Sequence, residues 1–130
     1  MYWLLFKHQR TFKVPLTKTD IYDRLLNWFK RISASASQSV TYSEKDTSTF
    51  ESTIKLNIKA EDDLIQIEFN LTIYYESTFY KTTFEDFYIY YSTQPGSSTR
   101  TALHTENEWN IVKKYVNNVQ NSLYKNVMTH

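Results

Sequence analysis

Two neighbouring stretches of the sequence alternate between apolar and polar residues, and this pattern limits the fold more than any other. Successive side chains of a β-strand point to opposite faces, so alternation predicts a strand with one buried and one solvated face. The acidic run at residues 61–63 separates the two stretches and predicts a hairpin turn. The apolar positions are Phe50, Ile54, Leu56 and Ile58 in the first stretch and Ile65, Ile67, Phe69, Leu71 and Ile73 in the second.

Glycine and proline are scarce, which limits where the chain can turn sharply. The 130 residues include one glycine, Gly96, and two prolines, Pro15 and Pro95. We therefore expect long elements, with turns built mainly from Asp, Asn, Ser and Thr. Residues 94–101, which contain the Pro-Gly pair, are expected to form a loop.

Three further strands are predicted around this hairpin. Residues 2–14 favour a first strand that Pro15 ends, and Val40 and Tyr42 indicate a short one. Residues 79–92 favour a last strand, but its apolar positions change parity in the middle. We therefore expect a β-bulge, an extra residue in one strand, near Glu85 and Asp86.

Two helices complete the pattern, and each has a marked start. Thr17 with Asp20 is a weak form of the capping box, and Thr105 with Glu108 is a full one. Each helix then carries one apolar stripe at spacings of three and four residues, typical of a helix that packs one face on a sheet. The stripes are Ile21, Leu25, Phe29 and Ile32 in the first helix and Trp109, Val112, Val116, Val119, Leu123 and Val127 in the second. Together the patterns predict a single α+β domain over residues 1–130, in the order β-α-β-β-β-β-α, whose five-stranded antiparallel sheet has both helices on one face.

Composition excludes several classes of function. The chain has no cysteine, which excludes disulfides, thiolate nucleophiles and thiolate metal sites. Its net charge of +1 gives little attraction to nucleic acid or to an anionic membrane. The apolar run at residues 2–6 is too short for a signal-peptide core or a membrane span. We therefore expect a soluble domain and leave its compartment open.

Several short segments, spread over roughly residues 12–90, together resemble a known bacterial family. The segments are residues 15–24 (PLTKTDIYDR) leading to Trp28-Phe29, then Val40-Thr41-Tyr42, the turn at Asp46, the strand through Phe69, and Phe84-Glu85-Asp86-Phe87. The family is described as domain of unknown function 4468, with a fold like that of the TATA-binding protein. The resemblance implies that fold, and it carries over no functional residue, because the family has no known activity. Related domains often carry an export leader, and from residues 2–6 none is expected here. The chain also departs from the family at Ser48, Ser52 and Thr53, where glycines are expected.

No group of residues predicts catalysis or metal binding. The histidines, His8, His104 and His130, are isolated, and no carboxylate stands at metal-ligand spacing from them. The acidic run at residues 61–63 lacks the spacing and the glycine of a calcium loop, so a solvated turn is favoured. The sequence contains no nucleophile elbow and no phosphate-binding loop. We therefore expect no enzyme, no metal and no cofactor.

Tyrosines crowd two neighbouring strands and are the one notable surface feature. Adjacent tyrosines in a strand point to opposite faces, so one member of each pair must leave the helix-packed side. Two interpretations stay open, cross-strand pairs that stabilise the sheet and a half-exposed surface for a partner. Glu85 and Asp86 at the expected bulge are likewise either structural or directed toward a site. The candidate binding surface consists of Tyr74, Tyr75, Tyr80, Tyr88, Tyr90 and Tyr91.

These observations favour a non-catalytic binding or interaction module. Its ligand would be a protein partner or a hydrophobic small molecule, held on the tyrosine face or in a cavity between the sheet and the C-terminal helix. The alternative is a structural module that buries the tyrosine face in a homodimer. We do not expect nucleic acid, because a saddle like that of the TATA-binding protein needs two repeats and basic flanks.

Overall fold

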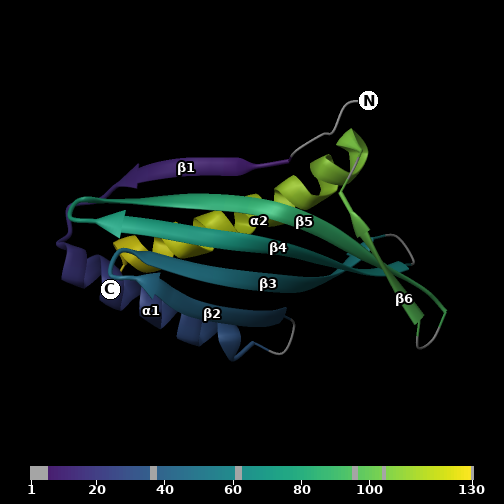
Figure 1. Cartoon of the computed structure of the whole chain (residues 1–130), viewed down its shortest axis with the longest axis horizontal. Coiled ribbons are helices and arrows are strands. Elements are labelled where there is room, and N and C mark those ends of the chain that lie inside the picture. The colour runs from purple at the N-terminus through teal and green to yellow at the C-terminus, as the bar shows by residue number, and fades with distance from the viewer. Residues whose placement is uncertain (1–5, 36–37, 61–62, 95–96, 104, 130) are drawn as a thin grey trace.

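The computed structural model of the chain describes residues 6–35, 38–60, 63–94, 97–103 and 105–129, and Figure 1 shows how its elements are arranged. The predicted α+β class is confirmed, with two helices and an antiparallel sheet. In chain order the elements are β1 (His8–Lys13), α1 (Lys18–Ser33), β2 (Gln38–Asp46), β3 (Thr49–Ala60), β4 (Asp63–Glu76), β5 (Phe79–Gln94), β6 (Ser97–Ala102) and α2 (Glu106–Met128).

The strands form one sheet in the order β1-β5-β4-β3-β2, with β6 also paired to β5. β1 pairs with the first half of β5 and β6 with the second half, so the two lie end to end along one edge of β5. The three long strands β3, β4 and β5 are consecutive in the chain and form the middle of the sheet (Figure 1).

The sheet has six strands where five were expected, because part of the predicted loop at residues 94–101 is strand β6. This strand (SSTRTA) has no alternation of apolar residues, and its pairing with β5 makes it a strand. β2 is also longer than the short strand expected at Val40 and Tyr42. The first strand begins at His8, and residues 2–5 of the expected strand lie outside the described residues.

Both helices begin where their capping residues predict. The Thr17 side chain accepts a hydrogen bond from the backbone N–H of Asp20 at 3.2 Å. At the start of α2, Thr105 and Glu108 form the reciprocal capping box, in which each side chain accepts from the backbone of the other. Such caps satisfy N–H groups that have no partner within the helix, which explains why the boundaries are so well marked in the sequence.

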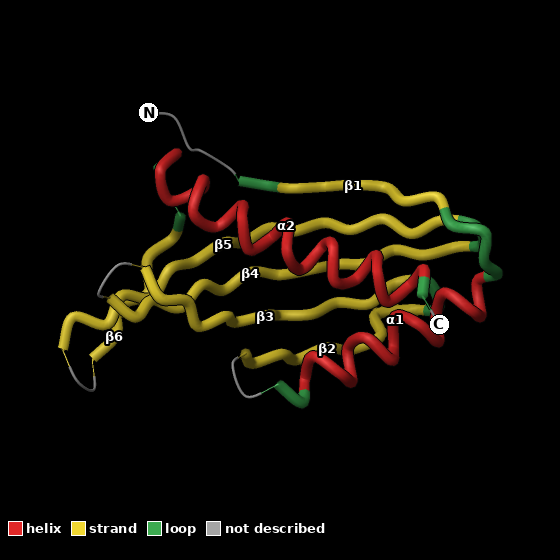
Figure 2. The backbone as a smooth tube through the Cα atoms, turned by 180° about the vertical axis from the view of Figure 1, so that it is seen from behind, coloured by secondary structure: helices red, strands yellow, loops and turns green. Residues whose placement is uncertain are grey.

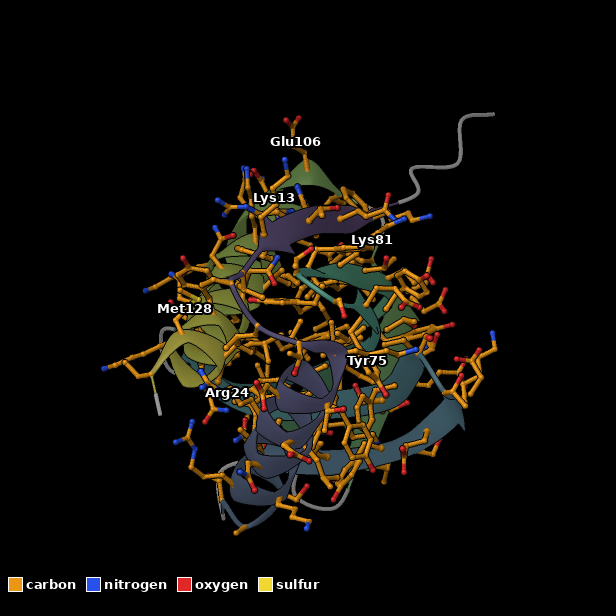
Figure 3. The ribbon with its side chains drawn as sticks, turned by 90° about the vertical axis from the view of Figure 1, so that its left-hand side faces the viewer. Lys13, Arg24, Tyr75, Lys81, Glu106 and Met128 are labelled. Atoms are coloured by element: carbon orange, nitrogen blue, oxygen red, sulfur yellow. The ribbon has the colours of Figure 1, made fainter. Side chains whose placement is uncertain are left out.

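Both helices lie on one face of the sheet, which we call the helix face (Figure 2). Seen along the strands, Arg24 and Met128 project on the helix side and Lys81 on the opposite side, the open face (Figure 3). The apolar positions of β3 and β4 point to the helix face and form one core with both helices. Among the largest fully buried side chains are Trp28, Tyr80, Phe29, Phe50, Phe69 and Phe84.

The predicted stripe of α2 is buried at Val112, Val116, Leu123 and Val127, but it differs from the prediction near its middle. Val119 is only partly buried, whereas Gln120 is buried, with 2% of its surface exposed. Its Oε1 atom accepts a hydrogen bond from the Thr82 hydroxyl at 2.9 Å, which offsets part of the cost of burying an amide. Neither described helix is long and apolar enough to cross a membrane.

Candidate functional site

The tyrosines of the candidate surface divide between the two faces of the sheet. Tyr75 and Tyr80 are buried on the helix face, with 2% and 0% of their surface exposed. Tyr80 stacks on Phe12 of β1 with ring centroids 5.0 Å apart. These two tyrosines are therefore core residues, and their inclusion in the predicted binding surface is corrected. Tyr91 belongs to β5, but its side chain lies outside the described part of the structure.

Tyr74, Tyr88 and Tyr90 occupy positions of the open face and lie near its two ends. The Tyr90 hydroxyl donates to Oε1 of Glu68 at 2.9 Å, and Tyr74 donates to Oε1 of Glu76 at 3.2 Å. Glu68 and Tyr74 stand six positions apart in β4, a distance of about 20 Å along a strand. The exposed tyrosines therefore do not form one continuous aromatic patch.

A β-bulge interrupts the pairing of β4 with β5 between these ends. Glu68 pairs with Tyr88 and Asn70 with Glu85, so Asp86 and Phe87 together oppose the single residue between Glu68 and Asn70. Asp86 has a φ of 57°, in the left-handed region that residues other than glycine enter at a cost. The bulge reverses which residues of β5 face the helices, which is the change of parity visible in the sequence.

Side chains of three strands form a hydrogen-bonded chain across the open face at this bulge. The Thr53 hydroxyl donates to Oδ1 of Asn70 at 3.0 Å, and Nδ2 of Asn70 donates to Oδ2 of Asp86 at 3.0 Å. Asn70 can accept through its oxygen and donate through its nitrogen, so these bonds fix the orientation of its amide. The Asp86 carboxylate is in this way held at a defined place although it is exposed.

This chain of hydrogen bonds lies within a polar hollow of about 520 Å³ that extends over β2, β3, β4 and β5. We call this hollow the bulge groove. Three ion pairs are present among the described side chains, and none of them involves Glu85 or Asp86. The described residues also contain no group of three or more His, Asp or Glu side chains placed to hold a metal ion. The residues lining the groove include Thr41, Glu51, Thr53, Asn70, Glu85 and Asp86.

A second hollow lies on the helix face, between α1, α2 and strands β2 and β3. It has a volume of about 220 Å³, and we call it the helix pocket. The helices are joined at one end, where Arg24 donates to the carbonyl of Val127 and Asn126 donates to the carbonyl of Arg24. From there they diverge across the sheet (Figure 2), and the pocket lies in the gap. Its lining includes Trp28, Ile32, Leu56, Tyr115, Val119 and Ser122.

A polar network near the start of α1 resembles an activated serine but lacks the arrangement for catalysis. Nζ of Lys18 donates to the Ser48 hydroxyl at 2.7 Å and lies 3.4 Å from Oε1 of Glu76. The Ser48 hydroxyl in turn donates to Glu76 at 2.9 Å. An ammonium beside a carboxylate serves as a donor and not as a base, so this network is best explained as a tie between α1 and two hairpin turns. The hydrogen bond from Ser48, with the charge of Lys18, lowers the pKa of Glu76.

His8, the one histidine whose position the structure describes, lines neither hollow. Burial lowers the pKa of His8, with smaller effects from Lys113 and Arg10, and its ring lies 6.0 Å from that of Phe84. His104, His130 and the first two residues of the acidic run at residues 61–63 lie outside the described residues. Asn70 and Thr53 of the bulge groove were missed in the sequence, because they occupy ordinary polar positions of alternating strands and only the register places them beside Asp86.

Comparison with known proteins identifies relatives of this fold. The profile of a family described as a domain of unknown function (DUF4468) with TBP-like fold matches residues 8–90. The crystal structure of a TBP-like protein from Parabacteroides distasonis is similar with a TM-score of 0.78 and 12% identity, covering 95% of this chain and 92% of that one. A DUF4468 family protein from Bacteroides ovatus has a TM-score of 0.54 and 12% identity, covering 74% of this chain and 59% of that one. A search of curated proteins finds no match.

Proposed function

Because the chain belongs to the DUF4468 family of TBP-like domains, whose function is unassigned, we propose a function from the face of the sheet that the helices leave open. The domain binds a basic segment of a partner protein in the bulge groove. The observation that supports this most is the hydrogen-bonded chain from Thr53 through Asn70 to Asp86 within a hollow of about 520 Å³. A bulge that holds a carboxylate in a costly backbone conformation is a common feature of binding sites.

The charge of the groove supports a basic partner. Glu85 and Asp86 have no ion pair among the described side chains, and Glu51 is joined only to exposed Lys45, at 3.5 Å. These carboxylates are spread over a wide hollow, which favours a ligand with several donor groups over a single metal ion. Lysine and arginine side chains donate to carboxylates with stronger bonds than neutral donors do.

The same charges disfavour the two other occupants of this face. Nucleic acid would bring phosphates against Glu85 and Asp86, and the resulting repulsion would weaken binding. A symmetric homodimer centred on the groove would place these carboxylates against their own copies, because a two-fold contact joins the same patch on both subunits. A homodimer through this face would therefore have to avoid the bulge.

Selection from a random peptide library tests the proposal. The wild-type chain would be the target, and the double variant E85Q/D86N would be the counter-target. Asparagine tolerates a left-handed backbone and can still accept the bond from Asn70, so D86N removes charge with little change of structure. The matched control is Asp23→Asn, which removes an exposed carboxylate from α1 on the other side of the sheet.

We expect peptides rich in lysine and arginine to be enriched and to bind E85Q/D86N roughly tenfold more weakly, a loss of about 1.4 kcal/mol. Asp23→Asn should leave their binding unchanged, and added salt should weaken it because the attraction is between charges. The proposal is wrong if no basic peptides are enriched, or if those that are enriched bind wild type and E85Q/D86N equally. Light scattering of the free chain would show separately whether it forms a dimer.

A further inference from the structure

The helix pocket has an origin that can be traced to the packing of the helices. Where α1 and α2 are joined, the sheet beneath them is fully covered, as the buried side chains of Phe50 and Ile73 show. Farther along, the helices have diverged and Leu56 is only half-buried, although its neighbours on the helix face of β3, Ile54 and Ile58, are buried. The pocket is therefore a hollow over core residues that the two helices cannot reach together.

Apolar side chains from three elements surround this hollow and are left half-buried by it. Ile32 of α1, Leu56 of β3, and Tyr115 and Val119 of α2 all pack against the core while keeping part of their surface exposed. Ile32 and Val119 occupy apolar stripe positions that the sequence predicts to be buried. Removing apolar surface from water is favourable, and an apolar molecule in this pocket would cover apolar side chains on several sides.

Hydrogen bonds define the floor and the rim of the pocket. Nε1 of Trp28, a residue with 1% of its surface exposed, donates to the Ser122 hydroxyl at 3.1 Å, and Nε2 of Gln38 donates to the carbonyl of Ile32 at 3.2 Å. These bonds tie α1 to α2 and to β2 around the hollow, so its shape is largely fixed before any ligand enters. Among the described residues that line it, none is charged.

We propose that the helix pocket binds a small uncharged molecule built around one ring, aromatic or alicyclic. Its volume of about 220 Å³ sets the size of the ligand. An apolar cavity of about 150 Å³ is large enough to bind benzene, so one ring with a short substituent fits. The absence of charge from the described lining sets the second requirement, because an ion would lose hydration without gaining a counter-charge. The Ser122 and Asn118 side chains can bond to a polar substituent at the rim.

Three probes of nearly equal size and different charge test this: benzyl alcohol, benzoate and benzylammonium. The indole N–H of Trp28 is the natural reporter, since it lies in the pocket and donates to Ser122. In a two-dimensional ¹H–¹⁵N spectrum its signal can be assigned with Ser122→Ala, which alters its acceptor, and with Trp3→Phe and Trp109→Phe, which remove the other indoles.

Benzyl alcohol is expected to shift the Trp28 indole signal saturably, and the two charged probes should bind at least roughly tenfold more weakly. Val119→Phe should fill the pocket and abolish the shift, whereas Asn121→Phe adds the same ring to an exposed position of α2 outside the lining and should leave it intact. Ser122→Leu, at an exposed position on the rim, blocks the pocket independently if Val119→Phe does not fold.

The inference fails if benzyl alcohol leaves the Trp28 signal unchanged up to its solubility limit, or if the shift persists in the blocked variants. Equal binding of benzoate or benzylammonium would show that the chemical class is wrong. The double variant E85Q/D86N lies on the opposite face and should bind benzyl alcohol as wild type does, so the outcome is independent of the bulge groove.

Discussion

Asn70 of β4 and Asp86 of β5 are joined by a hydrogen bond of 3.0 Å at the point where the register of their strands shifts. The bond holds the carboxylate of a residue whose own backbone lies in the left-handed region, with a φ of 57°. Strain and hydrogen bonding therefore meet at one position of the open face. Substitutions of different shape and polarity at Asp86 can separate the two effects.

Asp86→Gly should change the free energy of unfolding by no more than about 1 kcal/mol, because relief of a strain of about 1–2 kcal/mol offsets a lost hydrogen bond of about 1 kcal/mol. Asp86→Val loses the same bond and forces a β-branched side chain into the left-handed region, so it should be less stable than Asp86→Gly by about 2 kcal/mol. Urea unfolding measures both. Equal loss in the two variants would mean that the backbone of Asp86 is not strained in solution.

Removing one member of the buried pair of Thr82 and Gln120 should lower the free energy of unfolding more than replacing both with apolar residues. Among the described residues, Nε2 of Gln120 has no hydrogen-bond partner, and its Oε1 depends on the Thr82 hydroxyl. Thr82→Val leaves the whole amide of Gln120 buried without a partner and should cost about 1–3 kcal/mol. The double variant Thr82→Val with Gln120→Leu removes both polar groups and should be at least as stable as wild type. A double-mutant cycle from urea unfolding gives the coupling, and additive losses would contradict the prediction.

Acid should destabilise the fold partly through Glu76. The hydrogen bond from Ser48, aided by Lys18, lowers the pKa of Glu76 below its ordinary value of 4.5. The folded state therefore binds this proton less readily than the unfolded chain does, and the stabilisation is present above pH 4.5 and lost as the pH falls through the lowered pKa. Glu76→Gln should make the decline in unfolding free energy below this pH shallower. Asp23→Asn is the control for charge alone, and an equal change in both variants would count against Glu76.

Alkali should also destabilise the fold, and it should do so partly through Tyr80. Burial, with a smaller effect of Tyr124, raises the pKa of Tyr80 above its ordinary value of 10.0, although Arg10 opposes this. The folded state then keeps a proton that the unfolded chain releases, so stability falls as the pH rises above 10.0.

Tyr80→Phe should therefore reduce this alkaline loss. At neutral pH it should leave stability unchanged or raise it slightly, because the hydroxyl has no hydrogen-bond partner among the described residues. Urea unfolding at neutral and alkaline pH measures both effects, and Tyr115→Phe serves as the control, because it removes the hydroxyl of a tyrosine that is only half-buried. A marked loss of stability at neutral pH would mean that the hydroxyl of Tyr80 has a partner in solution.

Features set by neighbouring residues could be predicted from the sequence. Thr17 and Thr105 mark the helix starts because a cap depends on residues three positions away. The bulge near Glu85 and Asp86 could be predicted because it reverses the parity of apolar residues along one strand. The opposite directions of Tyr74 and Tyr75 follow from strand geometry in the same way.

Features that depend on distant packing could not be predicted in this way. Residues 97–102 are polar and follow a Pro-Gly pair, so nothing local distinguishes β6 from a loop. The bond between Asn70 and Asp86 requires the register of two strands, and the helix pocket requires the angle between two helices. Gln120 is the exception, because it stands four residues after Val116 and three before Leu123, and so continues a stripe that was assumed to be apolar throughout.

β1 and β6 lie end to end on the same edge of β5, and they come from opposite ends of the chain. A fragment that stops with the family match at residue 90 would keep β1 but lose β6 and α2. The remaining end of β5, residues 88–90, would then lose its pairing with β6, and the core would lose its contacts with α2. Unpaired strand edges and exposed apolar surface recruit other chains. We therefore expect such a fragment to aggregate, although it contains the whole span that the family profile matches. Relatives of this domain should be expressed with their last helix and not cut where the profile match ends.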